Sequence, residues 1–282
     1  MKKAIPNTLT LCNLICGCFG IVCAFNNQLD WAGYFIGIAA IFDFLDGFSA
    51  RLLNAKSAIG AQLDSLADMV TFGVLPAIIM FQLLSISFGE YFTVFSERPI
   101  DHMFVQSLAF LIAAFSALRL AKFNVDDSQT DSFVGMPTPA IAIFIGSLPI
   151  ILNGLDFNFY NYLTEDMLLV VDKVQYWSDI DAWVVSSLQS STVLAVIAIF
   201  CSVLLVVPVR MLALKFKGFG WQNNKQIFVF LILVSVLTIY AIVAYSFYLS
   251  GLPDIGLMVI PLVIVIYPIY SILMNTFAGK EN

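Results

Sequence analysis

Four aspartates stand at helical spacing in two apolar parts of this chain. Asp43 and Asp46 are three residues apart, which places both on one face of a helix. Asp64 and Asp68, four residues apart, share a face of the next helix. Two antiparallel helices would bring these carboxylates together, and hard divalent cations such as Mg²⁺ and Mn²⁺ prefer oxygen ligands of this kind. A pair of such ions about 3.5–4 Å apart clamps the attacking and leaving oxygens of a phosphoryl displacement, which is the chemistry that this spacing predicts.

Small residues accompany the aspartates on the same two faces. Gly47, Ala50 and Gly60 leave room for a bulky ligand to approach the helix backbones closely. Arg51 ends the first of these helices, where its guanidinium can pair with a phosphate through two hydrogen bonds. The simpler alternative is that the aspartates form structural hydrogen bonds or line an ion pathway.

The composition indicates that these helices lie in a membrane. Of the 282 residues, 60% are hydrophobic and 11% are charged, whereas a soluble domain has roughly 25% charged residues. Mean hydropathy is +0.93. The expected membrane helices cover 4–29, 31–50, 69–89, 102–118, 132–155, 182–209, 226–253 and 255–279. We therefore expect an all-α integral membrane protein, a polytopic bundle of about eight transmembrane helices, with its active site at the cytoplasmic side of the second and third.

The basic residues predict how this bundle is oriented. With the N-terminus inside, eleven of the thirteen lysines and arginines face the cytoplasm, and only Arg98 and Lys173 lie outside. We expect a multi-pass protein of the cell inner (cytoplasmic) membrane with both termini in the cytoplasm. The first apolar run is longer than a signal-peptide core and lacks a small-x-small cleavage site, so it is expected to be retained as a helix.

Other reactive residue types give little support to a different chemistry. The five cysteines have no metal-ligand companions nearby and are expected to be packing residues. The only histidine, His102, is expected at the external end of its helix, remote from every other polar cluster, which argues against histidine catalysis. The helices after residue 190 carry almost no ionisable groups, so we expect them to serve as scaffold or oligomer contacts.

One extended motif carries a resemblance to a known family. The pattern is Asp43-x2-Asp46-Gly47-x2-Ala50-Arg51-x8-Gly60-x3-Asp64-x3-Asp68. Without a gap or substitution, it resembles the signature of the CDP-alcohol phosphatidyltransferases. The resemblance implies a membrane enzyme that moves a phosphatidyl group from CDP-diacylglycerol to an alcohol and releases CMP. It also implies that the four aspartates bind two divalent cations, Mg²⁺ or Mn²⁺, and that Asp68 is in addition the general base.

The same resemblance implies a nucleotide site that includes the N-terminal sequence "PNTLT". The implied nucleotide-binding residues are Pro6, Asn7, Thr10, Gly47, Ala50, Arg51, Ser57 and Gly60. Taken alone, "PNTLT" is also typical of a helix start with a proline in its first turn, and the two interpretations are compatible.

Two further segments bear on the acceptor alcohol. The sequences "ALRLAKFN" (117–124) and "FVGMPTPA" (133–140), with the opening "IPNTLTLCNLICG", resemble the phosphatidylserine synthase branch of that family. A serine carboxylate needs a cation, and Arg119, Lys122 and Asn124 are the candidates to bind it. The branch usually has arginine where this chain has Lys122, and a lysine cannot form the planar two-hydrogen-bond contact of a guanidinium. Anchoring of the helix at the membrane interface is the alternative for both cations.

The expected partners are therefore CDP-diacylglycerol, L-serine and membrane lipids, with a homodimer implied by the resemblance and no nucleic acid. Glycerol 3-phosphate or an inositol phosphate is the alternative acceptor, and an intramembrane prenyltransferase or a cation-coupled transporter is the alternative class. The expected organisation is a catalytic core at 1–150 with helices one to five, an extracytoplasmic acidic loop at 151–189, and membrane helices six to eight at 190–282.

Overall fold

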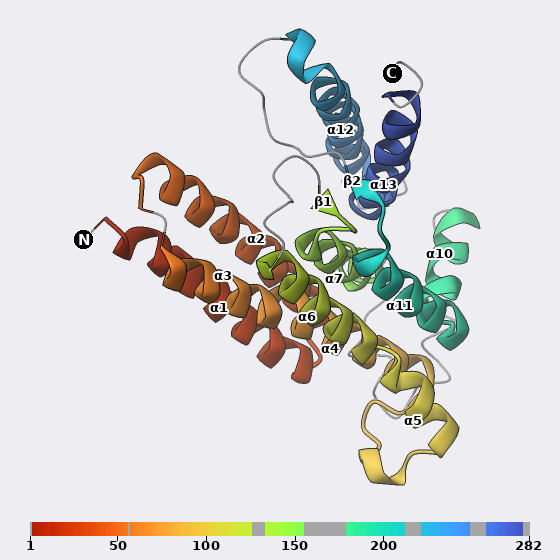
Figure 1. Ribbon diagram of the computed structural model, residues 1–282. Helices are drawn as coiled ribbons and strands as arrows, with labels where there is room; N and C mark the ends of the chain where they lie inside the picture. Colours follow the sequence, from red (N-terminus) through yellow and green to blue (C-terminus); the bar gives the residue numbers. More distant parts are fainter. Residues whose placement is uncertain are drawn as a thin grey trace.

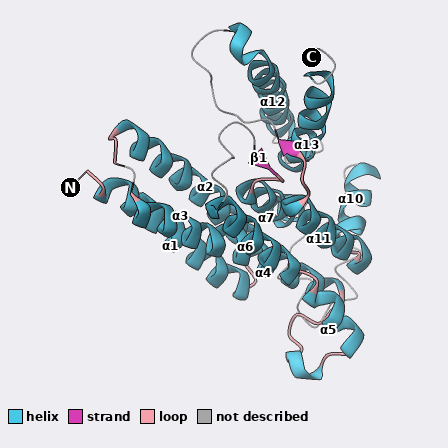
Figure 2. Ribbon diagram, viewed as in Figure 1, coloured by secondary structure: helices cyan, strands magenta, loops and turns pink. Residues whose placement is uncertain are grey.

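The computed structural model describes residues 2–55, 57–125, 133–154, 179–211, 221–248 and 258–278. These residues are almost entirely helical, as predicted (Figure 1, Figure 2). The α-helices are α1 (Ala4–Phe25), α2 (Leu29–Leu52), α3 (Ala58–Asp68), α4 (Leu75–Ser87), α5 (Ile100–Ser107), α6 (Phe110–Val125), α7 (Thr138–Gly154), α10 (Asp179–Gln189), α11 (Ser191–Val206), α12 (Trp221–Tyr248) and α13 (Val259–Ala278). A π-helix, η1 (Met69–Val74), joins α3 to α4, and a 3-10 helix, η2 (Phe95–Glu97), precedes α5. Two short strands, β1 (Phe133–Val134) and β2 (Arg210–Met211), pair in antiparallel fashion.

Three helices of the described residues are long and apolar enough to cross a membrane. They are Ala4–Phe25, Ala58–Ser87 and Ile100–Val125. A fourth span results if Ala182–Gln189 and Ser191–Val206, which meet at 78°, are counted together. The apolar helices fit a membrane protein, but the expected count of about eight transmembrane helices is not confirmed. Most of the expected acidic loop, 155–178, lies outside the described residues.

The central span is the continuous run of α3, η1 and α4. It contacts α1, α2, α6 and α7, and its α4 part also contacts α11. Phe72, Leu75, Ile79 and Leu84 from this run are fully buried, because apolar side chains meet helices on every side. Asp64 and Asp68 belong to the same run, so the most enclosed span of the described bundle also carries two of the four aspartates.

Small residues allow a close approach between helices at two crossings in and around this span. Gly17 of α1 lies against Thr71, and a Cβ atom placed on the glycine would collide with the threonine side chain. Gly33 of α2 lies against Gly146 of α7 in the same way. Small residues at such crossings allow tight packing between membrane helices. The turn between α1 and α2 contains Asn27 with φ 60°, a left-handed conformation that asparagine tolerates better than most residues.

A buried polar network occupies the end of the bundle near α5. Arg98 donates from Nη1 to Ser85 Oγ and to Gln106 Oε1, both at 2.9 Å. Gln106 Nε2 donates to Glu90 Oε2 at 2.8 Å, and His102 Nδ1 lies 2.6 Å from Glu90 Oε1. Burial lowers the pKa of Arg98, and the charge of Glu90 opposes that shift. The prediction that His102 is remote from every polar cluster is therefore wrong, because the loop before α5 folds its polar residues back onto it.

Candidate active site

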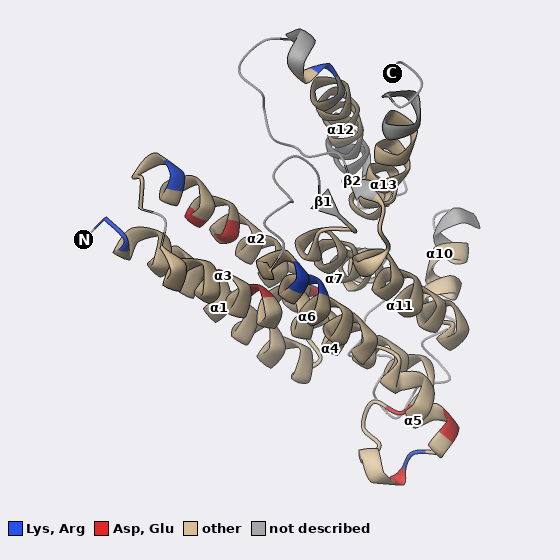
Figure 3. Cartoon of the chain, viewed as in Figure 1, with Lys and Arg blue, Asp and Glu red and all other residues tan. Residues whose placement is uncertain are grey.

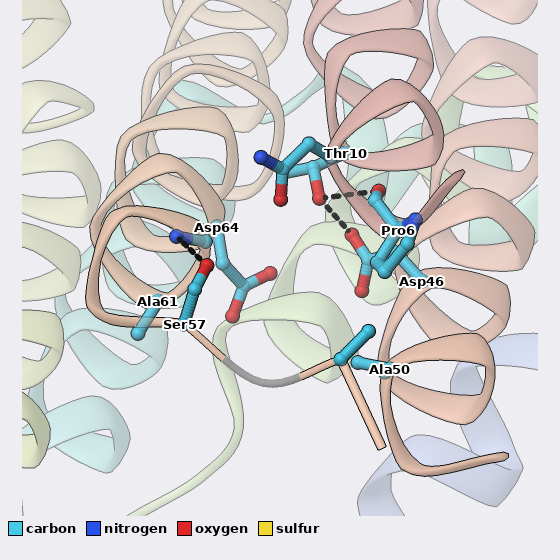
Figure 4. A pocket seen from close by; sticks show the side chains of 11 residues that line it. Pro6, Thr10, Asp46, Ala50, Ser57, Ala61 and Asp64 are labelled. Carbon is cyan, nitrogen blue, oxygen red and sulfur yellow. Dashed lines mark hydrogen bonds between the residues drawn. The ribbon is translucent and has the colours of Figure 1, made fainter. Parts of the chain in front are cut away.

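A pocket of about 200 Å³ opens where α1, the end of α2 and the start of α3 converge (Figure 4). The lining residues are Pro6, Asn7, Thr10, Asp46, Gly47, Ala50, Ala55, Ser57, Gly60, Ala61 and Asp64. Seven of the eight residues implied for nucleotide binding are in this set. The eighth, Arg51, is exposed and is not among the lining residues. The structure thus brings "PNTLT" next to the glycine and alanine positions of the motif.

Local hydrogen bonds shape two sides of this pocket. Thr10 Oγ1 lies 2.6 Å from Asp46 Oδ2, to which it donates, and 3.1 Å from the carbonyl oxygen of Pro6 (Figure 4). Ser57 is the N-cap of α3 and accepts a hydrogen bond from the backbone N–H of Gly60 at 3.1 Å, as serine commonly does at this position. These bonds hold Asp46 on one wall and fix the start of α3 on the other.

Three of the four predicted metal ligands form a compact acidic group. The carboxylates of Asp43, Asp64 and Asp68 each offer an oxygen within 4.8 Å of the others. Asp46 is not in this group, and one of its oxygens accepts a hydrogen bond from Thr10. Its charge still acts on Asp43 and Asp64. Four acidic groups so close together repel one another, and a bound cation offsets such repulsion.

The donor set fits a hard divalent cation. All the ligands in this group are carboxylate oxygens, the type that Mg²⁺ and Mn²⁺ favour. Asp64 Oδ1 is buried and has no hydrogen-bond partner among the described residues, so it has a lone pair available for a metal. A buried acceptor without a partner is costly unless a ligand satisfies it. The group formed by Asp43, Asp64 and Asp68 is therefore suited to hold such an ion.

Asp68 has a partner that sequence reasoning missed. Asn13 is fully buried, and its Nδ2 donates to Asp68 Oδ1 at 3.2 Å. Asn13 comes one helical turn after Thr10 on α1, so the i, i+3 spacing that relates it to "PNTLT" could have identified it. The π-helix η1 begins directly after Asp68, and π-helical turns are frequent at functional sites.

The three residues proposed for serine binding differ in their contacts with this centre. Arg119 of α6 lies near enough to Asp68 for the two charges to interact. Its Nε is buried and has no hydrogen-bond partner in the described part of the chain. Asn124 Nδ2 donates to Ser65 Oγ at 2.9 Å, so it joins the end of α6 to α3. Lys122 is exposed, and no described contact connects it to the aspartates.

The C-terminal part of the chain also reaches this centre. Tyr267 of α13 is buried and lies near enough to Arg119 for electrostatic interaction. The ring of Phe230 on α12 packs against Tyr267, with 5.6 Å between the ring centroids. The helices after residue 190 were expected to serve as scaffold or oligomer contacts, since they have few ionisable groups. Tyr267 is polar without being charged at neutral pH, which is why a search for charges did not find it.

Comparisons with known proteins identify the family of the chain. The family model described as CDP-alcohol phosphatidyltransferase matches residues 3–188. Over 142 residues the chain is 34% identical to a CDP-diacylglycerol--serine O-phosphatidyltransferase of Helicobacter pylori (strain J99). A protein of the same name from Bacillus subtilis (strain 168) is 38% identical over 135 residues. An archaetidylserine synthase of Methanothermobacter thermautotrophicus is 29% identical over 192 residues.

These matches cover only part of each protein. The aligned segment covers 50% of this chain and 54% of the Helicobacter relative. The corresponding values are 48% and 69% for the Bacillus relative, and 67% and 73% for the archaeal one. The chain thus spans about half the length of the Helicobacter relative, and the family match ends before α11, α12 and α13.

Proposed function

Because the chain belongs to the CDP-alcohol phosphatidyltransferase family, we propose that it transfers a phosphatidyl group from CDP-diacylglycerol to L-serine. The products are phosphatidylserine and CMP. The observation that carries the proposal is the group of Asp43, Asp64 and Asp68 beside a pocket lined by the residues implied for nucleotide binding. The names of the bacterial relatives support serine as the acceptor.

The nucleotide part of the substrate occupies the pocket between α1, α2 and α3. Gly47 faces open space, since a Cβ placed there meets no atom within 4 Å, so its missing side chain leaves room for the ligand. The first backbone N–H groups of α3 favour an anion at the start of that helix. Arg51, at the exposed end of α2, provides a guanidinium for a phosphate at the rim.

The aspartates hold the cations and prepare the acceptor. Asp43, Asp46, Asp64 and Asp68 would hold two divalent ions, Mg²⁺ or Mn²⁺. When bound, these ions neutralise the diphosphate and stabilise the charge that develops in the transition state. Asp68 takes the proton of the serine hydroxyl as general base. The serine oxygen then forms a bond to the lipid-side phosphorus while the bond from that phosphorus to the CMP oxygen breaks.

The acceptor enters between α3 and α6. Arg119 binds the serine carboxylate, because its buried guanidinium lies beside Asp68 and a guanidinium is well matched to a carboxylate. Asn124 and Lys122 stand nearer the opening of this space. In the membrane, the positive-inside distribution favours the cytoplasmic side for the site and for both termini, within a homodimer in the inner membrane. The catalytic core covers 1–150, followed by the external acidic loop 151–189 and the membrane helices of 190–282.

An assay of CMP release tests this proposal directly. The purified full-length protein, in detergent micelles with CDP-diacylglycerol and Mn²⁺, is expected to release CMP when L-serine is added. CMP release with glycerol 3-phosphate or an inositol phosphate, but not with serine, would contradict the proposal that serine is the acceptor. A prenyltransferase or a cation-coupled transporter would release no CMP with any of them. A single displacement inverts the configuration at phosphorus, so retention would contradict the direct mechanism.

A further inference from the structure

Two residues that interact with Asp68, Asn13 and Arg119, each have one buried polar atom without a hydrogen-bond partner among the described residues. These atoms are Asn13 Oδ1 and Arg119 Nε. The first is a hydrogen-bond acceptor and the second is a donor. Each unsatisfied buried group destabilises the folded protein unless a ligand or a water meets it. Because the side chains of Asn13 and Arg119 both interact with the proposed base, these two unsatisfied atoms point to a ligand with complementary groups.

The orientation of the Asn13 amide is set by its neighbours. Its Nδ2 faces Asp68 Oδ1 at 3.2 Å, and an ionised carboxylate can only accept hydrogen bonds. The amide nitrogen must therefore face Asp68, and the amide oxygen is directed elsewhere. Thr71 Oγ1 donates to the backbone carbonyl of Asn13 at 3.2 Å, and Gly17 packs against the same threonine one turn later. These contacts keep α1 in one register against η1.

From this geometry we infer that Asn13 recognises the ammonium group of an amino-acid acceptor. The inference rests on the proposed function and gives each polar group of serine a partner. The ammonium donates to Asn13 Oδ1, the carboxylate accepts from Arg119, and the hydroxyl lies at Asp68. Glycerol 3-phosphate has no ammonium group and would leave the amide oxygen of Asn13 unsatisfied. Asn13 is thus a specificity residue, which also keeps one oxygen of Asp68 in place.

The test compares L-serine with 3-hydroxypropionate, which keeps the primary hydroxyl and the carboxylate but lacks the ammonium group. The wild-type protein, in micelles with CDP-diacylglycerol and Mn²⁺, is expected to have a kcat/KM for serine at least about tenfold above that for the analogue, since the hydrogen bond involves a charged donor. This comparison needs no mutation. Equal kcat/KM values for the two acceptors would overturn the inference.

The Asn13→Ala variant tests the residue itself. It is expected to lower the ratio of the two kcat/KM values about tenfold or more, mainly through the KM for serine, while the KM for CDP-diacylglycerol stays the same. Asn26→Ala is a matched control on the same helix, because Asn26 is exposed and its Nδ2 bonds to the carbonyl of Val22. The control is expected to keep the wild-type ratio.

The possible failures can be told apart. An unchanged ratio in active Asn13→Ala protein would overturn the inference and leave serine transfer intact. If the alanine variant does not fold, Asn13→Ser is measured in the same way, and the wild-type comparison of acceptors stands in either case. If the wild-type protein released CMP with glycerol 3-phosphate and not with serine, the proposed function and the inference would both be wrong.

Discussion

Two polar clusters in the described part of the chain lie at opposite ends of one helical span and differ in how their groups are paired. Asp64 and Asp68 belong to the first part of the Ala58–Ser87 run, and Ser85 lies near its other end, roughly 25 Å away at 1.5 Å per residue. Figure 3 shows charged residues along α2 and α6 and, far from them, around α5. In the cluster near α5 the donors meet acceptors, whereas the aspartate cluster holds four carboxylates with one cation, Arg119, nearby.

The two clusters differ in how many of their polar atoms have hydrogen-bond partners. In the network around Arg98, the guanidinium, Gln106, Glu90 and His102 all have partners. At the aspartate cluster, Asp64 Oδ1, Asn13 Oδ1 and Arg119 Nε have none among the described residues. A satisfied buried network contributes to stability, and an unsatisfied one lowers it. The atoms without partners at the aspartate cluster therefore support the proposal that cations and substrates bind there.

The largest effect on the difference between the two clusters is expected when divalent cations are removed. A chelator is expected to reduce CMP release to the background level, and Mn²⁺ is expected to restore it. Mn²⁺ at a hundred times its Kd should also stabilise the folded protein by about 2.7 kcal/mol, seen as a higher Tm in detergent. Asp64→Asn is the control, since it should lose most of this increase in Tm. Full activity after chelation would contradict a metal site at the aspartates.

Replacing Asp68 should lower activity strongly without lowering stability. Asp68→Asn is expected to reduce kcat about 10²–10⁴-fold, since it removes the general base. The Tm of the metal-free protein should stay the same or rise, because one of several repelling charges is gone. CMP release and thermal unfolding measure the two effects. The control is Asp101→Asn, at an exposed carboxylate on α5, which should change neither CMP release nor Tm. A large loss of Tm in Asp68→Asn would mean that Asp68 is structural.

Arg98→Ala, in the cluster near α5, should lower stability without lowering activity. The change leaves Gln106 and Ser85 without their donor and should lower the free energy of unfolding by about 1.5–3 kcal/mol. The kcat/KM for serine, measured below the lowered Tm, should equal the wild-type value, because the site is far away. The neighbouring Glu97→Gln is the control, since Glu97 is exposed. A drop in kcat/KM at unchanged Tm would link the α5 end to catalysis.

The smallest effect is expected at the link between α6 and α3. Asn124→Ala removes an exposed hydrogen bond to Ser65, and an exposed bond of this kind contributes about 0.5 kcal/mol, so activity should fall about twofold. The KM for serine is the quantity to measure. A tenfold rise in that KM would place Asn124 in contact with the acceptor, as the sequence resemblance suggests for it.

Much of the fold and of the candidate site could be predicted because it depends on the spacing of residues within a single helix. Apolar runs predicted the helices, and the separation of each aspartate pair predicted a shared helical face. The family resemblance is confirmed by the match over residues 3–188. The count of about eight membrane spans was not confirmed, since helix ends and breaks such as the 78° bend before α11 depend on packing.

The contacts between distant helices could not be read from any local pattern. Asn13, Arg119 and Tyr267 come from α1, α6 and α13, yet their interactions form one chain around Asp68. A hydrophobic pattern shows which face of a helix is buried and not which neighbour covers it. The isolation expected for His102 failed for the same reason, because its partner Glu90 lies across a turn in the chain.

The sequence by itself determined the ligand types, the spacing within each helix and the apolar lengths, because these follow from the repeat of a single helix. Only the tertiary structure decided which oxygens of the aspartates have a hydrogen-bond partner. It engages Asp46 with Thr10 and Asp68 with Asn13, and it leaves Asp64 Oδ1 without a partner among the described residues. The physical reason is that the register between helices is set by close packing at residues such as Gly17 and Gly33.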